Sequence, residues 1–299
     1  MKPLDHALIV GCGYVGRRLA LRLADIFDVT ALVRRAESAA ALNREGIRTA
    51  AIDLDRVKLE SLVPQKLEQA AIFYLAPPPR IGESDLRLDR FLQLATVPPR
   101  VFVYMSTTGV YGDTRGALVD ESRPLAPLTE RARRRVSAEE MTRVWCTESR
   151  VRRVILRVPG IYGPGRLPLE RLRKREPVIH SEEAGISNRI HVTDLVEACV
   201  IAALNPDARG VYNITDGSAA TATEFIDCLA RLTGLPPPPR VGMDEAQLTF
   251  SPERLSFLNE SRHVSNERML KHLGLKLKYP NMEEGIRESL ADEARGARD

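Results

Sequence analysis

The sequence predicts an α/β fold, a doubly wound parallel sheet covered by helices, with a small α/β lobe toward the C-terminus. Two observations predict it. Short apolar runs rich in valine, isoleucine and leucine alternate with runs of helical period through the first half of the chain, which is the element order of a parallel sheet. A glycine-rich turn also joins the first apolar run to the first helical run, as in nucleotide-binding sheets.

The individual elements follow from apolar periods and from the residues that end them. The first helical run places its apolar side chains on one face. Gly46 ends the second helical run. The pair Thr221 and Glu224 predicts a capping box at the start of a later helix. We expect strands at 7–10, 29–33, 47–52, 71–75, 101–105, 154–158 and 211–214, and helices at 14–24, 38–45, 85–95, 193–204, 221–233 and 265–274.

These elements divide the chain into two expected units and a tail. Residues 1–160, with 190–215 returning to them, form a nucleotide-binding domain of Rossmann type. Residues 161–189 and 216–290 form a small lobe on the substrate side, and the polar segment 291–299 is expected to be disordered. Residues 159–177 are rich in glycine, proline and arginine, which predicts loops there.

Composition excludes several classes of protein. Of 299 residues, 43% are hydrophobic and 28% charged, as in globular proteins in water. No apolar run reaches the roughly 20 residues that span a bilayer, and the first apolar run leads into glycines and not into a signal-peptide cleavage site. We therefore expect a cytoplasmic protein without a membrane partner.

Cysteine and histidine patterns predict no metal site. The four cysteines contain no Cys-x-x-Cys pair, and the five histidines lack the spacing of metal ligands, so we expect reduced thiols. The basic segment 130–135 is interpreted as a solvated helix face. Nucleic-acid binding is the weaker alternative, because no aromatic residues interleave these arginines. The cysteines are Cys12, Cys146, Cys199 and Cys228.

The glycine-rich turn predicts a dinucleotide site. Its glycines follow the pattern G-x-G-x-x-G directly after a strand and at the start of a helix. The first permits a tight turn, the second lets a pyrophosphate approach the backbone, and the third lets the helix pack on the strand. Backbone N–H groups at the helix start face the phosphates. The predicted contacts are Gly11, Cys12, Gly13, Tyr14, Val15 and Gly16.

The end of the second strand favours NADP(H) over NAD(H). Arg34 and Arg35 stand where an NAD site offers a carboxylate to the ribose, and no acidic residue appears before Glu37. Guanidinium groups bind a 2′-phosphate well. Further cofactor contacts are expected after the other strands, where open α/β sheets bind ligands: Asp53, Leu54, Leu75, Ala76, Pro77, Pro159 and Ile161.

Four later stretches resemble motifs of a known family. Residues 105–113 (Met-Ser-Thr-Thr-Gly-Val-Tyr-Gly-Asp), 156–165 (Leu-Arg-Val-Pro-Gly-Ile-Tyr-Gly-Pro-Gly), 189–195 (Arg-Ile-His-Val-Thr-Asp-Leu) and 210–214 (Gly-Val-Tyr-Asn-Ile) occur in the family's order. They resemble the extended short-chain dehydrogenases/reductases, which include nucleotide-sugar epimerases and dehydratases. The resemblance covers residues 7 to about 285. It implies a Rossmann-type fold and a nicotinamide cofactor.

The chain departs from that family at the reaction centre. The family uses a Tyr-x-x-x-Lys pair as acid/base, yet no tyrosine lies between Tyr111 and Tyr162 and no lysine between Lys66 and Lys174. The resemblance places arginines at both positions. A guanidinium stays protonated and offers no acceptor, so it cannot replace the tyrosine. Val10 also stands where the extended branch has its first glycine. The two arginines are Arg131, near the tyrosine position, and Arg135, near the lysine position.

Few residues remain as candidates for the chemistry. The resemblance implies that Thr107 holds a substrate oxygen, and Tyr111, just past the fifth strand, is a candidate acid/base. Thr108, Tyr162 and Arg166 are expected on the substrate side, and the arginines of segment 166–177 suit an anionic substrate. For both tyrosines the alternative is a packing role. We interpret His191 as a hydrogen-bonded loop histidine and Asp194 as a capping or orienting residue.

Two functions remain open. The first is an NADP-dependent oxidoreductase or sugar-nucleotide-modifying enzyme with non-standard catalytic residues and a small-molecule substrate. The second is a non-catalytic NADP(H)-binding redox sensor or regulator of a partner, which the missing Tyr/Lys pair motivates. The resemblance also implies a dimer, which many relatives form through the helix that carries the Tyr/Lys pair. The arginines of this chain would place like charges near the two-fold axis, which argues against that dimer.

Overall fold

Seven parallel strands form the central sheet, in the order β11–β7–β5–β4–β1–β2–β3. The structure is a computed structural model that describes residues 4–56 and 67–296. The chain builds outward from β1 in both directions, which is the doubly wound arrangement, so the predicted α/β fold is confirmed. The strands are β1 (His6–Val10), β2 (Asp28–Val33), β3 (Thr49–Ala51), β4 (Ala70–Tyr74), β5 (Val101–Thr107), β7 (Arg152–Val158) and β11 (Gly210–Asn213).

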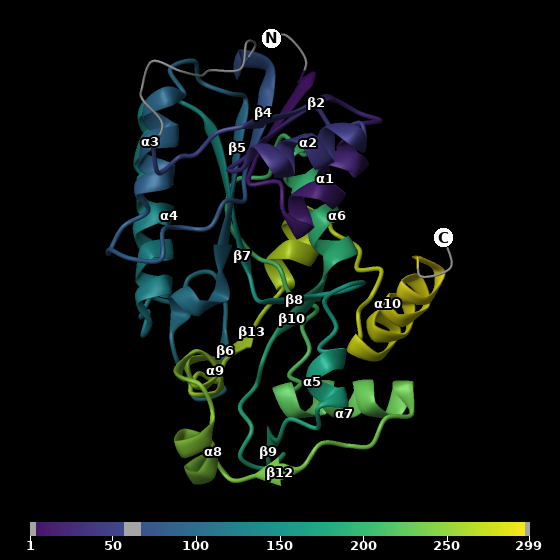
Figure 1. Cartoon of the computed structure of the whole chain (residues 1–299). Helices are drawn as coiled ribbons and strands as arrows, with labels where there is room; N and C mark the ends of the chain where they lie inside the picture. Colours follow the sequence, from purple (N-terminus) through teal and green to yellow (C-terminus); the bar gives the residue numbers. More distant parts are fainter. Residues whose placement is uncertain (1–3, 57–66, 297–299) are drawn as a thin grey trace.

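Helices cover both faces of this sheet, because successive side chains of each strand point to opposite faces. On β1, Ala7 and Ile9 pack into one apolar cluster, whereas Leu8 and Val10 pack into another. Figure 1 shows the two helical layers on opposite sides of the sheet. One layer holds α1 (Tyr14–Leu23), α2 (Ala36–Arg44) and α6 (Val192–Leu204), and the other holds α3 (Leu86–Leu94) and α4 (Glu130–Glu148).

Short elements beyond the sheet build the part of the molecule that faces its carboxyl edge (Figure 1). Strand pairs join segments far apart in the chain, and each pair is parallel. They are β8 (Gly160–Tyr162) with β10 (Arg189–His191), β9 (Val178–Ile179) with β12 (Arg240–Val241), and β6 (Leu118–Val119) with β13 (His263–Val264). The helices are α5 (Leu169–Arg173), α7 (Ala222–Thr233), α8 (Met243–Thr249), α9 (Pro252–Leu258) and α10 (Met282–Gly296).

Local signals for helix ends agree with the structure in two places. The capping box of Thr221 and Glu224 is present at the start of α7. A π-helical turn at Met269–Leu273 ends at Gly274, which has a φ of +80°, within the predicted helix 265–274. Asp194, expected to cap or orient a helix, holds a distant segment in place: its carboxylate accepts the backbone N–H groups of Lys278 and Tyr279. Three-residue and four-residue 3₁₀ helices occur at η1 (Leu67–Gln69) and η2 (Thr108–Tyr111).

Two expectations from the sequence are wrong. Residues 159–177 contain β8 and α5 and are not all loop, because β8 gains its strand pairing from β10, which no local pattern encodes. Residues 291–296 are helical and not disordered. Ion pairs of Arg295 with Glu288 and Asp292 hold this last part of α10, and residues 297–299 lie outside the described chain. Among the described helices, none is long and apolar enough to cross a membrane.

Candidate functional site

The glycine-rich turn has the backbone geometry that the sequence predicts. Gly11 adopts a φ of +95°, and a Cβ atom there would lie 2.6 Å from the backbone nitrogen of Ala76. A Cβ atom at Gly16 would lie 2.8 Å from the carbonyl oxygen of Gly11. Gly13 differs, because nothing lies within 4 Å of a Cβ atom built there. The open space above Gly13 is where a ligand can approach the backbone.

A cavity of about 400 Å³ lies over this turn. Gly13 occupies the N-cap position of α1 without a side-chain cap, so the first N–H groups of the helix are available to a ligand. Burial raises the pKa of Cys12 to about 11, which keeps its thiol protonated and unreactive. Besides the six residues of the turn, the lining includes Val33, Arg34, Ser38, Leu75, Pro77, Met105, Ile161 and Arg166.

A second cavity, of about 930 Å³, adjoins the first and shares Gly11, Arg34 and Pro77 with it. Its polar wall is a cluster that the sequence analysis missed. Asp55 accepts hydrogen bonds of 2.6 and 2.8 Å from Arg87, and Arg34 Nη1 lies 3.9 Å from its Oδ2. The hydrogen bond from Arg87 lowers the pKa of Asp55. Arg34 therefore stands at the rim with a distant carboxylate partner and N–H groups free for a ligand.

Most of the predicted cofactor residues line these two cavities, and three do not: Arg35, Asp53 and Pro159. Arg35 is exposed at the N-cap of α2. The Oδ1 of Asp53 accepts the backbone N–H of Asp55 within a local turn. Leu54 and Ala76 line the second cavity, and the residues of the turn, Arg34, Leu75, Pro77 and Ile161 line the first. Pro159 lines a third cavity, described next.

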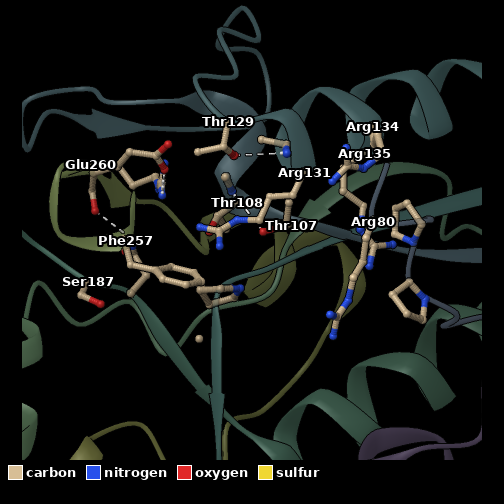
Figure 2. A pocket seen from close by; sticks show the side chains of 18 of the residues that line it. Arg80, Thr107, Thr108, Thr129, Arg131, Arg134, Arg135, Ser187, Phe257 and Glu260 are labelled. Carbon is tan, nitrogen blue, oxygen red and sulfur yellow. Dashed lines mark hydrogen bonds and ion pairs between the residues drawn. The ribbon is translucent and has the colours of Figure 1, made fainter. Parts of the chain in front are cut away.

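The third cavity, of about 460 Å³, continues from the second through 77–80 and reaches Thr107 and Thr108. Five arginines and one glutamate line it. Figure 2 shows side chains from α4, from the loop at Arg80 and from α9 converging on this space. The charged lining residues are Arg80, Arg131, Arg134, Arg135, Arg262 and Glu260.

The basic segment of α4 is not the solvated helix face that the sequence suggested. Arg131, Arg134 and Arg135 all line the third cavity, and only Arg133 of this group is exposed. Arg135, which the resemblance placed near the lysine position, donates hydrogen bonds of 3.0 Å to the Tyr104 hydroxyl and 2.8 Å to the Met105 carbonyl. The prediction failed because helical period alone cannot say which polar face meets solvent and which meets a neighbouring lobe.

The two candidate catalytic residues are separated by the structure. Thr107 lines the third cavity and caps η2, since its Oγ1 accepts the N–H of Gly109 at 3.2 Å. Tyr111 is only 1% exposed. Its hydroxyl donates to Asn213 Oδ1 at 2.7 Å and accepts from Arg157 at 2.9 Å. A buried phenol engaged on both sides cannot reach a ligand, which corrects the expectation that Tyr111 is catalytic.

Tyr162 is also buried, although its neighbourhood forms a cavity. Its ring contacts His191 and Phe225 edge-on, with centroids 5.2 and 5.4 Å apart. Burial raises the pKa of Tyr162 far above its ordinary value, so a phenolate does not form at neutral pH. Arg166 lies over the Tyr14 ring at 4.2 Å and lines the first cavity. Both residues also line a fourth cavity of about 320 Å³.

The arrangement can bind an extended ligand along the carboxyl edge of the sheet, from the glycine-rich turn to Thr107. Across residues 4–56 and 67–296, no group of three or more histidine, cysteine, aspartate or glutamate side chains could hold a metal ion. Besides the Asp55 cluster, Ser38, Phe257 and Glu260 line these cavities and were not predicted from the sequence. For Phe257 and Glu260 no local signal exists, because they come from the far end of the chain.

Comparisons with known proteins agree with this geometry. Residues 7–215 match the NAD dependent epimerase/dehydratase family. The chain is 27% identical to Protein YeeZ of Escherichia coli strain K12 over 294 residues, covering 93% of this chain and 97% of that protein. It is 25% identical to the dTDP-6-deoxy-L-talose 4-dehydrogenase (NAD(P)(+)) of Kitasatospora kifunensis over 260 residues, covering 78% and 80%.

Solved structures share the fold along nearly the whole chain. A functionally unknown conserved protein from Silicibacter pomeroyi DSS is 30% identical, with a TM-score of 0.80 over 96% of this chain and 99% of that chain. MoeE5 in complex with UDP-glucose and NAD is 22% identical, with a TM-score of 0.77 over 99% and 100%. The human epimerase family protein SDR39U1 with NADPH is 20% identical, with a TM-score of 0.73 over 96% and 99%. The chain belongs to the NAD dependent epimerase/dehydratase family.

Proposed function

We propose that this member of the NAD dependent epimerase/dehydratase family is an NADP(H)-dependent oxidoreductase or sugar-nucleotide-modifying enzyme with non-standard catalytic residues. One observation carries the proposal. Three adjoining cavities run from the glycine-rich turn, past Arg34, to Thr107. That path suits a dinucleotide whose reactive end lies beside the residue that holds a substrate oxygen. We also propose the cytoplasm as its location.

The residues present fit a nicotinamide dinucleotide. The open space at Gly13 admits a pyrophosphate against the N–H groups of α1. Similar folds occur with NAD in MoeE5 and with NADPH in the human protein, so likeness alone does not choose between the two cofactors. Arg34 favours the 2′-phosphate, because it lines both nucleotide cavities and lies 3.9 Å from Asp55, beyond a close ion pair. Bound there, the cofactor would supply a hydride donor or acceptor.

The side chains next to the reactive end act by orientation and charge. The Thr107 Oγ1 already accepts the N–H of Gly109, which leaves its hydroxyl proton to donate to a substrate oxygen. Arg135 holds a positive charge at the wall of the same cavity. Burial raises the pKa of its partner Tyr104 to about 12. Tyr104 is fully buried in β5 and is not an acid/base candidate.

Titration with NADPH and NADH tests the cofactor part of this proposal. We expect NADPH to bind at least about tenfold more tightly, and Arg34→Ala to remove about 1.4 kcal/mol or more of that preference. Arg35→Ala is the matched control, because Arg35 is the next residue and lines neither cavity. If neither cofactor binds, or if both variants lose the same preference, the cofactor assignment is wrong.

A second function is favoured by the burial of the tyrosines. Tyr111 and Tyr162 both lie in packed surroundings, so neither of the two candidate phenols is placed to act as the acid/base, which suits a non-catalytic NADP(H)-binding redox sensor. Incubation with NADPH and a panel of ketones and nucleotide sugars separates the two functions. A hydride-transfer product supports the enzyme. Tight cofactor binding without turnover, together with partner affinity that differs between NADPH and NADP⁺, supports the sensor.

A further inference from the structure

The arginines around the third cavity differ in whether the protein already uses their N–H groups. Arg135 donates to Tyr104 and Met105. Arg134 and Arg262 each donate to a backbone carbonyl and pair with a glutamate. Arg80 is exposed on a loop. Arg131 is held at the cavity wall, yet it forms no hydrogen bond or ion pair with any residue that the structure describes.

Arg131 is held in place by an aromatic ring. Its guanidinium carbon lies 3.7 Å from the centroid of the Phe257 ring. Figure 2 shows the side chain extending from α4 over this ring, with Thr107 and Thr108 beside it. Stacking covers one face of the planar group and limits its motion. The N–H donors lie in the plane of the group, so stacking leaves them free to face the cavity.

The acidic residues nearby do not neutralise this site. Glu260, in the cavity wall, already pairs with Arg262 at 2.5 Å through its Oε2. Its Oε1 is buried without a hydrogen bond. Glu260, and to a smaller extent Glu253 on α9, act electrostatically on Arg131, but among the described residues neither carboxylate forms an ion pair with it. Five guanidinium groups against one carboxylate leave the cavity strongly positive, and the two lobes that enclose it reduce screening by solvent.

We propose that Arg131 binds an oxyanion of the substrate, a carboxylate or a phosphate, beside Thr107. The inference rests on the proposed function, because it takes the occupant of this cavity to be the substrate. A guanidinium binds such a group through two parallel N–H donors. The position at which the resemblance places an acid/base tyrosine is then an anion-binding position, and the substrate carries an anionic group as well as an oxygen for Thr107.

Two anions distinguish the possible sources of this oxyanion. The full-length protein is titrated by calorimetry with inorganic phosphate and, separately, with malonate, at constant ionic strength set with chloride. Each titration is done with and without saturating NADPH. We expect at least one anion to bind, and the tighter one identifies the phosphate or carboxylate class. Binding that persists with NADPH present excludes the phosphate sites of the cofactor.

Variants of α4 assign the binding to Arg131. Arg131→Met keeps an apolar contact with Phe257 and should weaken anion binding at least about tenfold. Arg131→Lys should weaken it less, because an ammonium keeps the charge and loses the fork. Arg133→Met is the matched control, since Arg133 is two residues away, exposed, and absent from the cavity wall.

The outcomes separate this inference from the proposed function. If the wild type binds neither anion, or if Arg131→Met and Arg133→Met weaken binding equally, the inference is wrong. NADPH affinity should be unchanged in Arg131→Met. If the wild type binds an anion at Arg131 and does not bind NADPH, the proposed function fails and the anion site stands. If NADPH binds and neither anion does, the inferred anion site fails and the proposed cofactor binding stands.

Discussion

The segment from Thr107 to Tyr111 joins two polar regions of opposite character. At its start Thr107 faces an open cavity, where no carboxylate in the described part of the chain lies at ion-pair distance from Arg131. At its end Tyr111 enters a closed network in which Arg157 pairs with Glu139 at 2.7 Å and both side chains are buried. Glu139 and Arg131 lie on the same helix, α4. The comparison teaches that the partner supplied by other elements, and not the residue type, separates structural from ligand-binding arginines.

The closed network satisfies its buried charges completely. Glu139 accepts two hydrogen bonds from Arg157, at 3.0 and 2.7 Å, and a third from Ser106 at 2.5 Å. Tyr111 connects Arg157 to Asn213. Buried ion pairs persist only with such geometry, because the cost of removing charge from water is large. On the open side that cost is lower, since the cavity admits water or a ligand.

Removal of Glu139 should have the largest effect on this comparison. Glu139→Ala leaves Arg157 buried without its carboxylate, so we expect the free energy of unfolding to fall by about 3–5 kcal/mol. Urea denaturation measures it. The control is Glu140→Ala, because Glu140 is the next residue and pairs on the surface with Arg143. Equal and small losses in both variants would show that the network is not closed.

Asp216 adds a third case to this comparison. Unlike Glu139, it is buried without a close ion pair among the described residues. It is 7% exposed, and burial raises its pKa to about 6. The folded protein therefore binds the Asp216 proton more tightly than the unfolded chain does, so stability falls as pH rises from about 4 through about 6.

Asp216→Asn should abolish this dependence. Relative to the wild type, the variant should gain about 2 kcal/mol of unfolding free energy between pH 4 and pH 7. Urea denaturation of both proteins across this range isolates the difference. A difference that is constant with pH would mean that burial does not raise the pKa of Asp216, and the expectation would be wrong.

Tyr111→Phe should give the smallest effect of the three. Loss of the hydroxyl leaves Arg157 and Asn213 each without one partner, which costs about 1–2 kcal/mol of unfolding free energy. NADPH affinity should not change, because Tyr111 lines none of the three adjoining cavities. A loss of NADPH affinity or of turnover beyond the loss of stability would restore Tyr111 as a functional residue.

The cofactor side shows how far local sequence can predict a site. Gly11, Gly13 and Gly16 lie within six consecutive residues, and their spacing alone implied the tight turn and the open approach that the structure shows. Arg34 was predictable because it directly follows β2. Asp53, expected among the cofactor contacts, lines neither of the first two cavities, since its side chain turns back to the N–H of Asp55. The position of a residue at the end of a strand predicts that it lies at the rim of the site, but it does not predict which way its side chain points.

The substrate side shows where such prediction ends. The absence of tyrosine between Tyr111 and Tyr162 and of lysine between Lys66 and Lys174 was visible in the sequence, and so were the arginines of segment 130–135. The solvated face predicted for α4 was wrong, because Phe257 and Arg262, more than 120 residues further along the chain, close over that face. Tyr111 was a reasonable candidate by position. Its burial depends on Asn213 and Arg157, which come from two other strands.

By itself the sequence determined the α/β sheet, its order of strands and helices, and the glycine-rich turn, because contiguous residues encode periodicity and turn geometry. Only the tertiary structure decided that Arg157 is neutralised in the core while Arg131 stays available at a cavity. The physical reason is that the state of a charge depends on its partners and its burial. Elements far apart in the chain supply both.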